Sequence, residues 1–259
     1  MDYMLAVPGA MAIGLSLGLL GSGGSILTVP VLIYLLGQDE KVAIAGSLFI
    51  VGSIALAGGL QFLRAGFVQW RSVLVFGLPG MLGTYLGAML AAYVSGVMQL
   101  SLFALVMLGA SYLMLRPMDL EHADGRQRDA WKIGMDGLVV GVITGLVGVG
   151  GGFLIVPALI LLGGLSMHQA VATSLIIIAL KSYSGFYKYL DVLEQQALEL
   201  DWKTLFLVTG LGIAGSVVGS RLARRLPQAK LKRWFGVFLI IMGLYILARS
   251  GPAALGFQA

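Results

Sequence analysis

Long apolar runs separated by short polar stretches constrain this chain more than any other feature. Only 11% of its 259 residues are charged, against about 25% in a typical soluble domain. A run of ~20 apolar residues, at 1.5 Å per helical residue, matches the ~30 Å hydrocarbon layer of a bilayer. The sequence therefore predicts an all-α polytopic membrane protein that is surrounded by the lipid bilayer.

The composition argues against several chemistries. The chain has no cysteine, which excludes disulfides and thiol relays. Its two histidines, His122 and His168, are too few for a haem or zinc centre without much help from carboxylates. We find no paired metal ligands, no Ser–His–Asp set and no HExxH motif, so we expect no metal site, no cofactor and no enzyme activity. We attribute the net charge of +5 to cytoplasmic loops rather than to nucleic-acid binding.

The chain repeats itself. The glycine-rich stretch from Gly18 to Pro30 recurs 127 residues later, from Gly145 to Pro157. The same offset pairs Ser47 with Ser174, and after a short insertion an offset of 132 pairs Trp70 with Trp202 and Gly80 with Gly212. We therefore divide the chain into a first transmembrane repeat at 1–115, a polar linker at 116–132 and a second repeat at 133–259.

Each repeat contains four apolar segments. In the first repeat these lie near residues 4–36, 42–63, 72–93 and 97–115. In the second they lie near residues 134–164, 167–190, 203–223 and 232–249.

Equivalent loops of the two repeats carry opposite charge. The loop after the second segment is basic in the first repeat, at Arg64 and Arg71, and acidic in the second, at Asp191, Glu194, Glu199 and Asp201. The loop after the third segment is uncharged in the first repeat and basic in the second, at Arg221, Arg224, Arg225, Lys230, Lys232 and Arg233. Because basic loops face the cytoplasm, we predict inverted repeats, with the linker inside and both termini outside.

The first segment of each repeat is too long for one membrane span and too short for two. Its middle is rich in glycine, and each glycine costs about 1 kcal/mol in a helix interior. Inverted repeats also require an odd number of crossings. We therefore predict that each repeat is a glycine-broken re-entrant helical hairpin followed by three transmembrane helices. A single kinked span is the alternative.

Broken helices at mid-membrane are typical of secondary transporters, which bind substrate where the repeats meet. The new half-helices would begin near Gly24–Leu27 and Gly151–Leu154, and their N-termini would attract an anion. Packing alone is the competing explanation for these glycines. The predicted anion-binding residues are Ser22, Gly23, Gly24, Ser25, Thr28, Gly150, Gly151, Gly152, Ser174, Lys181 and Ser182.

Lys181 is the most informative of these residues. It lies within the apolar stretch Ala172–Leu190, and its equivalent in the first repeat is Ile54. An ionisable side chain at that depth indicates function, although a snorkelling lysine would have the same sequence. The motifs Gly83-x-x-x-Gly87 and Gly215-x-x-x-Gly219 predict close helix packing, and such glycine seams would also suit a homodimer.

The repeated G-x-x-x-G-x-G-G-x-x-x-x-V-P pattern, the run Ala170–Leu175 and the pair Asp201-Trp202 resemble the TauE/SafE family of sulfite exporters over nearly the whole chain. The resemblance implies a transporter of the bacterial inner membrane that carries small sulfur-containing anions, such as sulfite or organosulfonates. We expect export by alternating access around the midplane site. An anion channel of similar architecture is the alternative, and saturable flux would distinguish the two.

Overall fold

The computed structural model describes residues 3–20, 25–64, 66–115, 129–148, 152–161, 165, 167–223 and 228–254. Nearly all of them lie in helices, and none of them lies in a strand. In the first repeat the helices are α1 (Tyr3–Leu20), α2 (Ser25–Pro30), η1 (Val31–Leu35), α3 (Glu40–Arg64), α4 (Trp70–Ser72), η2 (Val73–Gly77), α5 (Leu78–Leu90), η3 (Ala91–Tyr93) and α6 (Gly96–Leu115). In the second repeat they are α7 (Ala130–Val147), α8 (Gly152–Leu161), α9 (Met167–Gln195), α10 (Trp202–Ala223) and α11 (Gln228–Ala254).

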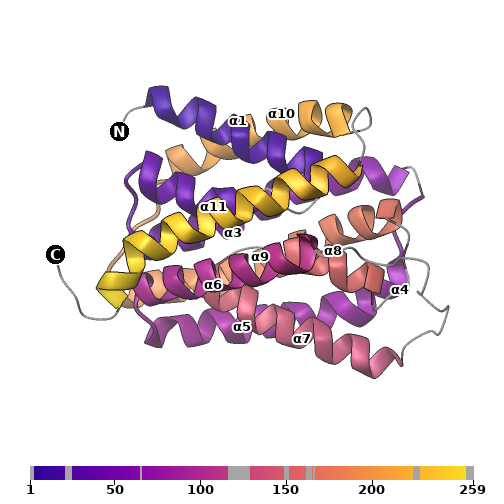
Figure 1. Ribbon diagram of the computed structural model, residues 1–259. Helices are drawn as coiled ribbons and strands as arrows, with labels where there is room; N and C mark the ends of the chain where they lie inside the picture. Colours follow the sequence, from indigo (N-terminus) through magenta and orange to yellow (C-terminus); the bar gives the residue numbers. More distant parts are fainter. Residues whose placement is uncertain are drawn as a thin grey trace.

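The predicted all-α polytopic membrane architecture is confirmed. Among the described residues, five helical stretches are long and apolar enough to cross a membrane, at Glu40–Leu60, Trp70–Tyr93, Ala130–Val147, Gln169–Gln195 and Trp202–Leu222. Shorter apolar helices lie beside them (Figure 1). Where the structure describes them, the predicted apolar segments lie almost entirely in helices.

The first segment of each repeat is interrupted, as predicted. In the second repeat α7 ends at Val147, and the capping residue Gly148 has a φ of +72°, in the left-handed region that favours glycine. In the first repeat α1 and η1 turn back on each other, since a Cβ at Gly9 would lie 2.8 Å from Val31 and 3.5 Å from Leu35. A single straight helix would hold residues 9 and 31 about 33 Å apart, and a moderate kink would not bring them into contact. The joining residues 21–24 and 149–151 lie outside the described residues, as does most of the linker.

The two repeats pack through paired glycine seams. Helix α1 lies on α10, where a Cβ at Gly14 or Gly18 would overlap the backbone of Gly212 or Ser216. The equivalent pair is α7 on α5, where Gly145 faces Thr84 in the same way. The predicted packing role of Gly83, Gly87, Gly215 and Gly219 is confirmed, because each lies against backbone of the partner helix. The seams that suggested a homodimer thus pack within the chain, and the dimer itself stays a prediction.

Equivalent helices of the two repeats run in opposite directions. Gly52 of α3 lies against Ser182 of α9 and Gly59 lies against Ile176, so these two helices are antiparallel. In Figure 1, α1 begins and α11 ends on the left of the view, whereas α7 begins on the right. This arrangement suits inverted repeats, whose orientation in a membrane stays a prediction.

We predict that Gly145→Ala destabilises the protein by about 1–3 kcal/mol, because the new methyl group would overlap the backbone of Thr84. Gly109→Ala is the matched control, since a Cβ at Gly109 meets nothing within 4 Å. Thermal unfolding in detergent, followed by tryptophan fluorescence, should show a lower Tm for the first variant only. Equal melting temperatures for the two variants would contradict the close packing of Gly145 against the backbone of Thr84.

Candidate functional site

Lys181 lies at the centre of the bundle. It is the middle residue of α9, 14 residues from both Met167 and Gln195, and its side chain is fully buried. Its Nζ atom has no hydrogen-bond partner among the described residues. A buried polar group without a partner is costly, so Lys181 is the side chain at the centre of α9 whose presence packing does not explain.

Glycines of the neighbouring helices make the space that the lysine occupies. A Cβ at Gly80 of α5 would lie 3.1 Å from the Lys181 Cδ atom and 3.3 Å from the Gly137 carbonyl of α7. We call this site, formed by Gly80, Gly137 and Lys181, the lysine slot. The equivalent slot in the first repeat holds Ile54 against Gly212. Since the fold is built with isoleucine in one copy, it does not itself require the lysine.

Hydroxyl groups surround the crossing of α3 and α9 beside the lysine slot. Ser182 is fully buried and its hydroxyl has no partner among the described residues. Tyr183 and Ser53 are joined through their hydroxyls at 2.9 Å, and Ser184 donates to the Met81 carbonyl at 3.0 Å. Of these hydroxyls, Ser182 is therefore the one without a partner among the described residues.

The break in the second repeat is held by side chains from three other helices. Ser47 of α3 donates to the Gly148 carbonyl. The Leu146 carbonyl accepts hydrogen bonds from the Gln99 side-chain amide of α6 and, at 3.0 Å, from the Tyr189 hydroxyl of α9. Our sequence reasoning missed Gln99 and Tyr189. Gln99 could have been identified from the sequence, because its amide side chain lies within an otherwise apolar helix.

The predicted site residues do not all meet at one point. Lys181 and Ser182 are adjacent, but Ser174 lies seven residues before Lys181, about 10 Å along α9, and donates to the Val171 carbonyl at 2.8 Å. Ser25 and Thr28 are buried in α2, and the Thr28 hydroxyl has no partner among the described residues. Gly152 begins α8. The other predicted residues, Ser22, Gly23, Gly24, Gly150 and Gly151, lie outside the described residues.

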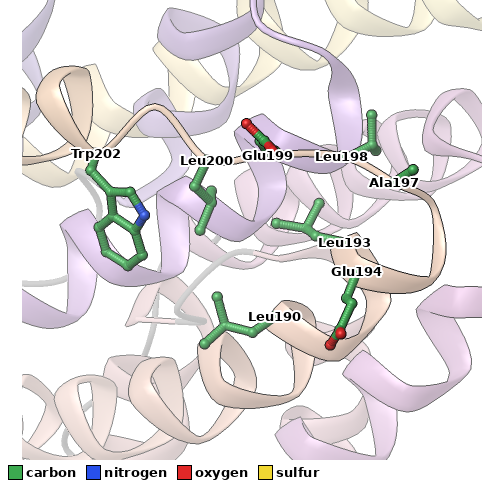
Figure 2. Close-up of a pocket in the computed structure, with 8 residues that line it drawn as sticks. All are labelled: Leu190, Leu193, Glu194, Ala197, Leu198, Glu199, Leu200 and Trp202. Carbon is green, nitrogen blue, oxygen red and sulfur yellow. The ribbon is translucent and has the colours of Figure 1, made fainter.

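A separate cleft of about 510 Å³ lies where α9 ends and α10 begins (Figure 2). Its lining residues are Leu190, Leu193, Glu194, Ala197, Leu198, Glu199, Leu200 and Trp202. The two glutamates would repel an anion, so this cleft does not suit the ligand that the lysine slot would attract. Trp202 packs edge-on against Phe49, whose ring also contacts Tyr183.

Helices long enough to cross a bilayer, with polar groups buried at their centre, define a multi-pass helical membrane protein. Residues 6–246 match the family model described as "Sulfite exporter TauE/SafE". The chain therefore belongs to the TauE/SafE family and is a membrane transporter.

Similar proteins include a probable membrane transporter protein of Xylella fastidiosa (strain 9a5c), which is 35% identical over 92% of each chain. The probable membrane transporter protein YunE of Bacillus subtilis (strain 168) is 28% identical, over 95% of this chain and 98% of the relative. A probable membrane transporter protein of Methanocaldococcus jannaschii is 22% identical, over 95% of this chain and 97% of the relative. No solved structure matches the chain.

We predict that Lys181→Met raises the Tm of the ligand-free protein by ~3 °C, because a well-packed apolar side chain would replace a buried group that has no partner. Lys41→Met is the matched control. The Lys41 ammonium is also buried, but it donates to the Ala91 carbonyl and, at 2.5 Å, to the Val94 carbonyl, so its loss should lower Tm. A marked fall in Tm for Lys181→Met would show that this lysine stabilises the fold.

Proposed function

We propose that this protein is a secondary transporter that exports small sulfur-containing anions, such as sulfite or organosulfonates, across a bacterial inner membrane. The observation that carries the proposal is Lys181, which is fully buried at the centre of α9 with no partner for its ammonium group among the described residues. The family description supports the class of substrate.

An anion in the lysine slot would supply the missing counter-ion. The electrostatic attraction is strong in a site of low dielectric constant, and it offsets part of the cost of removing both charges from water. The unpartnered Ser182 hydroxyl adds a hydrogen-bond donor next to the lysine. An oxyanion with several acceptor oxygens suits this pair of groups.

The packing of the repeats supports alternating access. The lysine slot is built from both halves of the chain, with Gly80 on α5 of the first repeat and Gly137 and Lys181 on α7 and α9 of the second. A rocking motion of one repeat against the other would therefore open and close the slot. The inside-negative membrane potential favours outward movement of an anion by ~2.3 kcal/mol per charge per 100 mV, in agreement with export.

Transport currents from proteoliposomes test the proposal. We expect sulfite or sulfoacetate to give a current that saturates with concentration, and we expect Lys181→Met to reduce that current at least tenfold, because the anion loses its counter-ion. Chloride and thiosulfate serve as comparison anions. Saturation supports a carrier, whereas a current that rises linearly with anion concentration would contradict alternating access and indicate a channel.

Lys188→Met is the control variant for the same experiment. Lys188 lies on the same helix, but its ammonium pairs with Asp191 at 2.8 Å and is partly exposed. We expect its current to stay within about twofold of the unaltered protein, since an exposed ion pair contributes little. Folded, inserted protein that carries none of these anions would overturn the proposed substrate class.

A further inference from the structure

The hydrogen bonds at the end of α7 also join this helix to α9. The Tyr189 hydroxyl of α9 donates to the Leu146 carbonyl at 3.0 Å. The Gln99 side-chain amide of α6 donates to the same carbonyl and, at 2.8 Å, to the Tyr189 hydroxyl. Tyr189 and Gln99 are both fully buried. We call the Tyr189 hydroxyl, the Gln99 amide and the Leu146 carbonyl the Tyr189 clamp.

The Tyr189 clamp lies on the same helix face as the lysine slot. Lys181, Gly185 and Tyr189 follow one another at intervals of four residues along α9, a spacing that places them on one face. Tyr189 lies about 12 Å from Lys181 along the helix axis. On α7, Leu146 lies about 14 Å from Gly137, the glycine of the slot. The two helices that supply the slot are therefore joined again about two turns away.

This hydrogen bond joins two helices that otherwise touch little. Helix α5 lies against both α7 and α9, whereas direct contact between α7 and α9 is slight. The lysine slot has the Gly137 carbonyl of α7 on one side and the Lys181 side chain of α9 on the other, with Gly80 of α5 between them. Because few other contacts hold α7 to α9, the Tyr189 clamp sets their separation and, with it, the width of the slot.

The other copy of the repeat lacks both the lysine and the clamp. Its equivalents of Tyr189 and Gln99 are Phe62 and Leu231, and its slot holds isoleucine. The polar slot and the polar clamp thus occur together, and the duplicated fold forms without either. The Gln99 Oε1 atom also has no hydrogen-bond partner among the described residues. A buried amide that is only half satisfied is not explained by packing alone.

We propose that Tyr189 and Gln99 are positioning residues that set the width of the lysine slot and so select between anions by size. The clamp holds α7 and α9 close together, which favours a compact anion such as sulfite over a larger organosulfonate. Since the clamp lies about two turns from Lys181, it acts through the helices that it holds. The selectivity rests on the proposed function, whereas the effect of the clamp on helix separation does not.

Tyr189→Phe tests the selectivity, because it removes one hydroxyl and copies Phe62 of the other repeat. We expect the Kd for sulfite, titrated on the purified protein, to rise about fivefold, and the Kd for sulfoacetate to change less than about twofold. Gln99→Leu should shift the ratio of the two Kd values in the same direction. The double variant should shift it no further than the larger single effect, because the two side chains act as a unit.

Tyr187→Phe is the matched control for this titration. Tyr187 lies on the same helix, but its side chain is 67% exposed and it takes no part in the clamp. We expect this variant to keep the ratio of the two Kd values.

Spin labels measure the separation of the helices without any anion. The chain has no cysteine, so Met135→Cys on α7 and Leu180→Cys on α9, both exposed positions, supply the two labelling sites. We expect Tyr189→Phe to broaden the distribution of distances between the labels and to shift it to longer values, as measured by electron paramagnetic resonance. Tyr187→Phe should leave the distribution unchanged.

The outcomes separate this role from the proposed transport. Unchanged label distances and an unchanged ratio of Kd values in Tyr189→Phe would overturn the positioning role and leave the proposed transport intact. A lower Tm with the same ratio would show a purely structural hydrogen bond and would also overturn it. Longer label distances in protein that binds neither anion would support control of helix separation by the clamp and overturn the proposed substrate class.

Discussion

Close contact between glycine and backbone across the two repeats is the constraint on which the rest of this structure depends. In lipid the hydrophobic effect does not hold helices together, so small residues that let backbones touch take over that role. Helices α1 and α10 meet in this way at Gly14 and Gly212, and the equivalent helices α7 and α5 meet at Gly145 and Thr84. The same closeness lets Gly80 and Gly137 leave a slot that a lysine side chain fills.

Because the chain is duplicated, each residue of one repeat can be compared with its equivalent in the other to see which side chains the fold requires. Lys181 in one repeat corresponds to Ile54 in the other, and Thr28 and Gln38 correspond to Ile155 and Leu165. In each pair the apolar member packs in a buried or partly buried core position, whereas the polar member is buried without a partner among the described residues. Departures from good packing that a fold does not need tend to mark functional sites. By this reasoning Lys181, which the fold does not require, marks the position where we propose that an anion binds.

The sequence predicted the architecture well because its signals are local or repeated. Apolar length located the helices, clustered glycines located the break at Gly148, and the motif at Gly83 and Gly87 predicted a packing seam. The depth of Lys181 also followed from its position within an apolar run. Tyr189 could not be found in this way, because its hydrogen bond to the Leu146 carbonyl depends on contacts between helices that are far apart in the sequence. Ser174 was expected to line the site with Lys181, but its hydroxyl is used by its own helix.

The central claim is that an anion binds at Lys181, and equilibrium binding of radiolabelled sulfite to the purified protein tests it most directly. We expect saturable binding of one sulfite per chain in the unaltered protein. We also expect that Lys181→Met, which should fold at least as well, loses this binding. Equal sulfite binding by the two proteins would contradict the account, since the anion would then lie elsewhere in the bundle.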